Sequence, residues 1–158
     1  MTTHEAAGAA QIIPERYRTA VVPHVLVADA DAALAFYERA FGAVVDFRLD
    51  RPDGGGVLHA ELRIGDAVLM LGDAAEGPFS APSALGGTSV ALHVYVPDVD
   101  ALAAAAVAEG AELLQPPGDR FHGDRTAILR DPSGHLWVFL THLETVSGEE
   151  LERRLAQA

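Results

Sequence analysis

The sequence predicts an α+β fold built from two βαβββ modules, and three observations support this prediction. An H-V-x-V-x-D-x-D motif occurs twice, beginning at His24 and at His93, 69 residues apart (24 to 93). Each copy is followed by an alanine-rich stretch that ends at a glycine, Gly42 or Gly110. Three short apolar segments, separated by turn sequences, follow each stretch. A repeat of this kind indicates two similar structural units in one chain.

The repeated motif predicts a strand that leads into a helix. Its alternating apolar residues have the period of a strand. The helix that follows can be N-capped by an aspartate side chain, which accepts hydrogen bonds from the first free amides: Asp29 or Asp31 in the first copy, Asp98 or Asp100 in the second. Gly42 and Gly110 can adopt the left-handed conformation that ends a helix.

The remaining strands and the domain boundaries follow from apolar runs and turn residues. Three strands are expected after each helix, at residues 44–49, 57–64 and 67–71, and at residues 112–115, 126–130 and 136–142. We therefore expect a flexible tail over residues 1–19 and a single domain over residues 20–145. Within it, module one spans about 20–73, module two spans about 89–145, and the Gly-, Pro- and Ser-rich residues 72–88 link them. Residues 146–158 should form a C-terminal helix that starts near Ser147.

Composition restricts the classes of function. The 158 residues suffice for one domain, and the net charge of −12 disfavours binding to nucleic acid or to an anionic membrane. The absence of cysteine excludes disulfides and thiolate chemistry, and all 11 basic residues are arginines, which excludes a lysine Schiff base. The N-terminal residues lack the pattern of a secretory signal, and no apolar run reaches the roughly 20 residues of a membrane helix. We predict a cytoplasmic protein.

Four segments together resemble the vicinal oxygen chelate superfamily, which includes glyoxalases, bleomycin-resistance proteins and dioxygenases, and within it the PhnB-like branch. The segments are HVLVADADAALAFYERAFGA, HAELRIGDAVLML, SVALHVYVPDVDALAAAAVAEGA and GDRFHGDRTAILRDPSGHLWVFLTH. The resemblance implies an open, cup-shaped mixed barrel in which each sheet packs one face on its helix and turns the other to a cavity. It also implies a homodimer, with modules that pair within one chain or swap between chains.

The resemblance further implies where metal ligands would lie. Metal-dependent members place a His seven residues before the Asp that opens each helix, and a Glu near the start of the last strand. The corresponding residues here are all apolar: Val22, Leu69, Ala91 and Val138. Because an alkyl side chain cannot coordinate a divalent cation, we expect no metal at the inherited positions and no cofactor.

Strand alternation places several polar side chains on the cavity face. The expected ligand-binding residues are His24, His59, Glu61, Arg63, His93, Tyr95 and His142. Three interpretations remain open for them. They are a structural set that satisfies its own hydrogen bonds, the polar contacts of a small-molecule pocket, or a displaced metal site made by His24, Glu61 and His93 (or His59).

Two functions are therefore expected. The first is a binding protein that holds a small, partly apolar organic molecule without metal. The alternative is a lyase, isomerase or dioxygenase-like enzyme, with or without metal, in which Glu61 and His93 are the candidate catalytic residues because either could act as a general base. Among other residues, Asp124 and Arg125 are expected to form an ion pair, His135 to support its turn, and Trp137 to pack beneath a helix.

Overall fold

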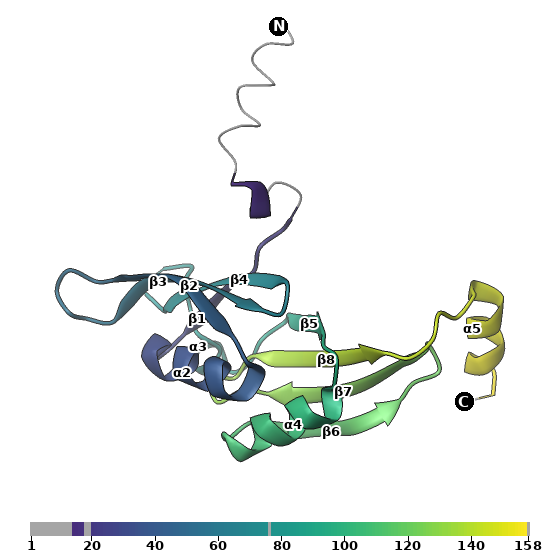
Figure 1. Ribbon diagram of the computed structural model, residues 1–158. Helices are drawn as coiled ribbons and strands as arrows, with labels where there is room; N and C mark the ends of the chain where they lie inside the picture. Colours follow the sequence, from purple (N-terminus) through teal and green to yellow (C-terminus); the bar gives the residue numbers. More distant parts are fainter. Residues whose placement is uncertain (1–13, 18–19, 76, 158) are drawn as a thin grey trace, which may run out of the picture.

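The computed structural model describes residues 14–17, 20–75 and 77–157, and it contains two βαβββ modules (Figure 1). Module one comprises β1 (His24–Val27), α2 (Ala30–Phe41), β2 (Val44–Asp50), β3 (Val57–Ile64) and β4 (Ala67–Asp73). Module two comprises β5 (Ala91–Tyr95), α4 (Val99–Ala108), β6 (Glu112–Asp119), β7 (Asp124–Arg130) and β8 (Leu136–His142). Short elements η1 (Glu15–Tyr17) and α3 (Pro82–Leu85) and the helix α5 (Gly148–Leu155) complete the fold. The predicted α+β, two-module architecture is confirmed.

Each module forms its own four-stranded mixed sheet with the same strand order. The orders are β1-β4-β3-β2 and β5-β8-β7-β6, with the first strand parallel to the last and the other pairs antiparallel. In register, His24 lies beside Met70 on β4, and His93 lies beside Val138 on β8. The two modules therefore repeat each other strand by strand, with His24 and His93 as equivalent residues.

Both long helices begin at the aspartates expected from the repeat. The Asp29 carboxylate accepts a hydrogen bond from the Ala32 amide at 3.0 Å, and the Asp98 carboxylate accepts one from the Ala101 amide at 2.9 Å. Gly42 ends α2 in the left-handed region at φ 64°. The sequence thus fixes both helices at the position where each can pack one face on its own sheet.

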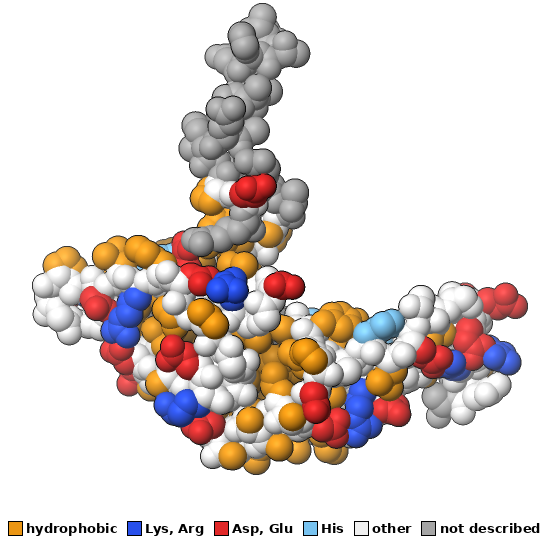
Figure 2. All heavy atoms as spheres, viewed as in Figure 1, with side chains coloured by type: hydrophobic (Ala, Val, Ile, Leu, Met, Phe, Trp, Pro, Cys, Tyr) orange, Lys and Arg blue, Asp and Glu red, His pale blue; other side chains and the backbone are white. Residues whose placement is uncertain are grey.

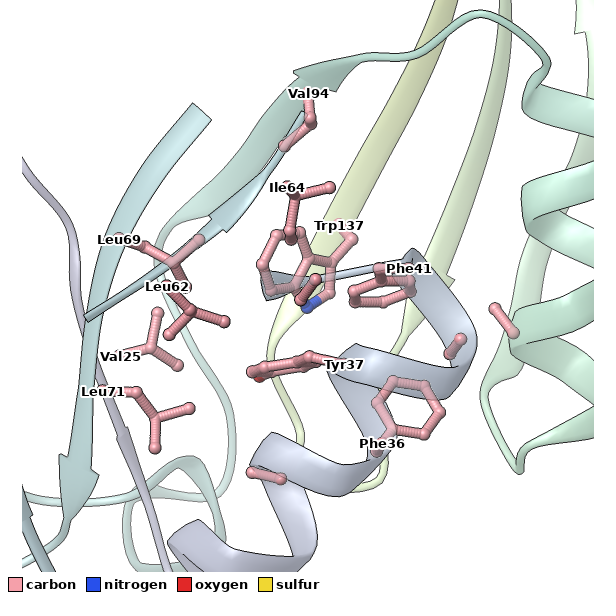
Figure 3. Close-up of a cluster of buried hydrophobic side chains, with 14 of the residues drawn as sticks. Val25, Phe36, Tyr37, Phe41, Leu62, Ile64, Leu69, Leu71, Val94 and Trp137 are labelled. Carbon is pink, nitrogen blue, oxygen red and sulfur yellow. The ribbon is translucent and has the colours of Figure 1, made fainter. Parts of the chain in front are cut away.

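The hydrophobic core is continuous across the two modules (Figure 3). The aromatic side chains of α2 lie between the sheets, and Tyr37 and Phe41 contact the Trp137 ring of β8 at centroid distances of 5.4 Å and 5.0 Å. Trp137 is 1% exposed, so the expectation that it packs beneath a helix is confirmed, although the helix belongs to the other module.

Asp131, at the turn before β8, ties the modules together with buried hydrogen bonds. Its carboxylate accepts from the Tyr37 hydroxyl at 2.5 Å and from the Trp137 indole at 2.8 Å, and also from two amides of its own turn. Burial and the neighbouring Asp131 raise the pKa of Tyr37 well above its ordinary value, so the phenol keeps the proton that it donates. His135 in the same turn reaches the Leu26 carbonyl at 2.8 Å, which agrees with the structural role expected for it.

The sheets do not close into a barrel. Among the described residues, no strand of one sheet pairs with a strand of the other. The face of each sheet opposite its helix is therefore open, and apolar side chains on it are exposed, with Phe47 at 48% and Tyr95 at 61%. Figure 2 shows hydrophobic side chains along the upper edge of the first sheet. The cup implied by the family resemblance is absent within one chain.

The terminal and linking segments agree in part with the predicted boundaries. Most of the predicted tail over residues 1–19 lies outside the described residues. The linker over residues 72–88 contains the end of β4 and the short α3. Helix α5 starts after Ser147, whose hydroxyl accepts from the Glu150 amide at 3.3 Å, and it lies beyond the end of the second sheet (Figure 1).

Candidate functional site

Three predicted site residues gather on the open face of the first sheet. The His24 and His59 rings lie edge to face at a centroid distance of 5.6 Å, and His59 Nε2 lies 3.6 Å from a carboxylate oxygen of Glu61. The alternation of β3 explains this, since Ala60, Leu62 and Ile64 point into the core and the residues between them point outward. We call His24, His59 and Glu61 the first-sheet cluster.

Aromatic residues border the first-sheet cluster. Phe79, from the segment before α3, lies 6.2 Å from the His24 ring, and Phe47 of β2 lies 6.3 Å from the His59 ring. The pKa of His24 is lowered mainly by burial of its side chain and to a smaller extent by the charge of His59. The neutral form of His24 is therefore favoured, which suits a hydrogen-bond role in a partly apolar surface.

Arg63 lies on the same face but is engaged elsewhere. Its guanidinium donates to both oxygens of Asp46, at 2.7 Å and 3.0 Å, beside a bulge in β2. This bidentate pair fixes Arg63 at the end of the strand. The structure thus places Arg63 on the predicted face while giving its charge a partner.

A second polar group lies on the open face of the second sheet. The Asp124 carboxylate accepts a hydrogen bond from the Tyr95 hydroxyl at 2.9 Å. Its oxygens also lie 2.8 Å from Nδ1 of His142 and 3.3 Å from Nδ1 of His122. The second ring nitrogen of His142 lies 3.2 Å from the Thr145 hydroxyl. We call Tyr95, His122, Asp124, His142 and Thr145 the Asp124 cluster.

The expected ion pair between Asp124 and Arg125 is wrong. Arg125 instead pairs with Asp100 at 2.5 Å and with Asp119 at 2.7 Å. Consecutive strand residues point to opposite faces, so Asp124 faces the open side while Arg125 faces the start of α4. Alternation along β7 was the sequence signal that could have identified Asp124 as a site residue.

Asp124 is a buried anion without an arginine partner. It is 6% exposed. Burial alone would raise the pKa of Asp124, but hydrogen bonds with His142 and Tyr95 and the nearby histidine charges hold it below its ordinary value. The group is therefore ionised at neutral pH, and it can accept hydrogen bonds but cannot donate them.

His93 joins neither cluster. Among the described residues it forms no hydrogen bond or ion pair with the other predicted site residues. It lines an apolar pocket of about 310 Å³ between β4 and β5, together with Pro23, Val68, Leu69 and Trp137. A neighbouring pocket of about 280 Å³ is lined by His24, Leu92 and His135. The predicted residues are thus divided between the two sheets.

The inherited metal positions do not fit a metal. Ala91 and Val138 lie on the open face as expected, but Leu69 is 3% exposed and faces the core. By register, the residue equivalent to Val138 is Met70, because Met70 lies beside His24 as Val138 lies beside His93. A thioether is a ligand for soft ions, whereas hard divalent cations prefer oxygen ligands. In the described part of the chain, no group of three or more His, Asp or Glu side chains is arranged so that it could hold a metal ion, and His93 lies on the other sheet from His24 and Glu61.

The comparisons with known proteins settle the family. A sequence profile of the glyoxalase/bleomycin resistance protein/dioxygenase superfamily matches residues 19–139. The chain belongs to this superfamily. The vicinal oxygen chelate resemblance is thereby confirmed at the level of the superfamily.

Relatives within the superfamily agree with this assignment. An uncharacterized protein of Mycobacterium bovis is 37% identical over 141 residues, which cover 87% of this chain and 92% of that protein. The crystal structure of TioX from Micromonospora sp. ML1 superposes with a TM-score of 0.62 at 31% identity, covering 82% of this chain and all of that one. A glyoxalase-related enzyme from Fulvimarina pelagi shares the fold, with a TM-score of 0.58 at 24% identity over 78% of this chain and 88% of that one.

Proposed function

We propose that the chain binds a small, partly apolar organic molecule on the open sheet faces, without metal. The observation that carries this proposal is the first-sheet cluster, where His24, His59 and Glu61 form a polar centre bordered by exposed aromatic rings. Ligand sites usually combine an apolar lining with a few convergent polar groups. The apolar residues at the inherited ligand positions support binding that needs no metal.

A second copy of the chain completes the cup in this proposal. Val44, Phe47 and Leu49 of β2 are each about half exposed, and they form an apolar row along the sheet edge. Exposed apolar patches mark interaction surfaces. The open sheet of a second copy of the chain is also apolar, so it can pack against this row. Light scattering should give the mass of two chains, and the mass of one chain at high concentration would contradict the dimer.

Binding can be measured with a fluorescent probe of apolar sites, anilinonaphthalene sulfonate, on protein stripped with a chelator. We expect Phe47→Arg to weaken probe binding about tenfold, because roughly 1.4 kcal/mol is lost with the aromatic contact. Val107→Arg is the matched control, since Val107 is exposed on α4, away from the open face. Equal effects of the two variants, or binding that disappears with the chelator and returns with added metal, would contradict the proposal.

An enzyme remains the alternative function, and the 3.6 Å approach of His59 to Glu61 favours it. A carboxylate beside an imidazole can move a proton to or from a bound substrate. In this alternative the chain is a lyase, isomerase or dioxygenase-like catalyst on a small molecule, and its two candidate acid–base groups, Glu61 beside His59 on the first sheet and His93 on the second sheet, act on the substrate separately. Turnover should be abolished by Glu61→Gln and by His93→Ala. Unchanged rates in both variants would contradict the assignment of these two residues as catalytic groups.

Three further predictions accompany this proposal. Membership in the PhnB-like branch is supported by the Gly123-Asp124-Arg125 sequence ahead of the turn at Asp131. A cytoplasmic location is expected from the absence of cysteine, and the charge of −12 disfavours nucleic-acid and membrane partners. Within the described residues, no helix has the length and apolar character needed to span a bilayer.

A further inference from the structure

The Asp124 cluster is separate from the positions that carry metal in relatives. Its residues lie at the far end of the second sheet, where β5 and β8 end and β7 begins. Asp124 and His142 are register partners on neighbouring strands, and Tyr95 follows His93 on the same face. The cluster is therefore built by strand pairing and does not depend on a loop alone.

The acceptor role of Asp124 assigns the donors around it. Ionised Asp124 can only accept, so Nδ1 of His142 carries a proton and donates it, as does the Tyr95 hydroxyl. In the neutral imidazole Nε2 is then an acceptor, and the Thr145 hydroxyl donates to it at 3.2 Å. The result is a directed chain from Thr145 through His142 to Asp124, in which a carboxylate orients the imidazole.

The two ends of this chain differ in their exposure. The Asp124 side chain is 8% exposed, whereas the His142 side chain is 54% exposed and Thr145 lies on an exposed segment. A ligand hydroxyl can therefore reach Nε2 by replacing the Thr145 hydroxyl. Neither nearby arginine neutralises Asp124, because Arg125 binds Asp100 and Arg120 donates to Thr126 at 2.9 Å.

We propose that the Asp124 cluster binds a weakly acidic hydroxyl, that of a phenol or an enol, and that His142 Nε2 takes its proton. The ligand O–H bond breaks, the N–H bond forms at Nε2, and the electron pair remains on the ligand oxygen. The product is an ion pair of phenolate (or enolate) and imidazolium, and the negative charge of Asp124 stabilises the imidazolium through Nδ1. His122, Tyr95 and Thr145 are the other titratable or hydrogen-bonding groups that face this pair. The inference rests on the proposed function in that the open sheet faces hold the ligand, with the Asp124 cluster on the second sheet and the first-sheet cluster on the first.

The test uses para-nitrophenol, whose ionised form absorbs visible light, with the full chain. Below the pH at which the free phenol titrates, the protein should raise the ionised fraction of the bound phenol about tenfold, which corresponds to one pKa unit. His142→Gln and Asp124→Asn should both abolish this increase. Asp66→Asn, which removes an exposed carboxylate from the turn between β3 and β4, should leave it unchanged. Thr145→Ala should preserve or strengthen it, since the competing hydroxyl is removed.

The outcomes separate this inference from the proposed function. An unshifted phenol with the wild-type chain, or an equal shift with His142→Gln, overturns the inference. If anilinonaphthalene sulfonate still responds to Phe47→Arg in that case, the proposed function survives alone. A folded His142→Gln variant, verified by circular dichroism, that binds this fluorescent probe normally but no longer ionises the phenol supports both.

Discussion

His93 lies in register with Val138, its partner on the neighbouring parallel strand β8. Ala91, two residues earlier, lies on the same open face, so the two positions that would hold metal in this module are close together but apolar. The strand register therefore brings these two positions together, although neither side chain can coordinate a metal ion. Placing metal-binding side chains at both positions is a direct test.

We predict that Ala91→His together with Val138→Glu creates a site for a divalent metal. Imidazole and carboxylate ligands from one sheet suit Zn²⁺ at bond lengths of about 2.0–2.2 Å. Calorimetry with zinc should show affinity at least about tenfold above that of the wild-type chain, or about 1.4 kcal/mol. The matched control is Ala91→His with Val138→Gln, which keeps the volume but loses the charge. Wild-type affinity as high as that of the restored variant would contradict the prediction.

Asp131→Ala should lower the free energy of unfolding by about 3–5 kcal/mol, since it removes the acceptor of a buried hydrogen-bond network. The substitution leaves the Tyr37 hydroxyl and the Trp137 indole without a partner inside the core. Urea denaturation followed by Trp137 fluorescence measures the loss. Tyr37→Phe removes one donor together with its hydroxyl and should cost much less, so similar losses in the two variants would contradict this account.

The stability of the chain should fall as the pH drops below the ordinary histidine value of 6.5, in part because of His24. Its folded pKa is lowered, so the unfolded chain takes up a proton first on acidification. The stability that neutral His24 gives the fold is fully present above pH 6.5, and it is lost as the pH falls toward the lower pKa of His24 in the folded chain. Denaturation midpoints measured over this range should depend less on pH in His24→Gln. The same dependence in both proteins would argue against a role for His24.

Asp124 and Arg125 should behave as members of separate networks. Arg125→Gln breaks partly exposed pairs and should cost no more than about 1 kcal/mol. Asp124 has a lowered folded pKa, so its ionised form stabilises the fold above the ordinary value of 3.8, and this stability is lost as the pH falls below it. The stability difference between the wild-type chain and Asp124→Asn should therefore shrink at acid pH. A double-mutant cycle that gave a large coupling energy between Asp124 and Arg125 would contradict this prediction, because it would indicate that the two side chains interact directly.

Alternation along the strands predicted much of the first-sheet cluster. Ala60, Leu62 and Ile64 are buried and the polar residues between them face outward as expected, whereas at the start of β3 Val57 is buried and Leu58 is 44% exposed, against the predicted alternation. The repeat likewise placed both helix N-caps correctly. These features depend on local periodicity, which a sequence displays directly. The separation of His93 from Glu61 depends on how the modules pack, and no local pattern encodes it.

The equivalence of Leu69 with Val138 was wrong for a specific reason. The two-residue turn of module one closes on the pair Ile64 and Ala67, which faces the core, whereas the longer turn of module two closes on Arg130 and Leu136, which faces outward. The third residue of β4, Leu69, therefore faces the core, whereas the third residue of β8, Val138, faces outward. Register with the first strand of each module corrects the count to Met70.

The contact of Tyr37 with Asp131 also bears on how a duplicated gene can diverge. The phenol comes from one copy of the unit and the carboxylate from the other, so neither half retains a complete interior when it is separated. A chain cut within residues 77–81 would leave Trp137 without the aromatic rings of α2 and Asp131 without its phenol. The two halves are thus mutually dependent at the core, while the outer face of each sheet is free to carry different chemistry.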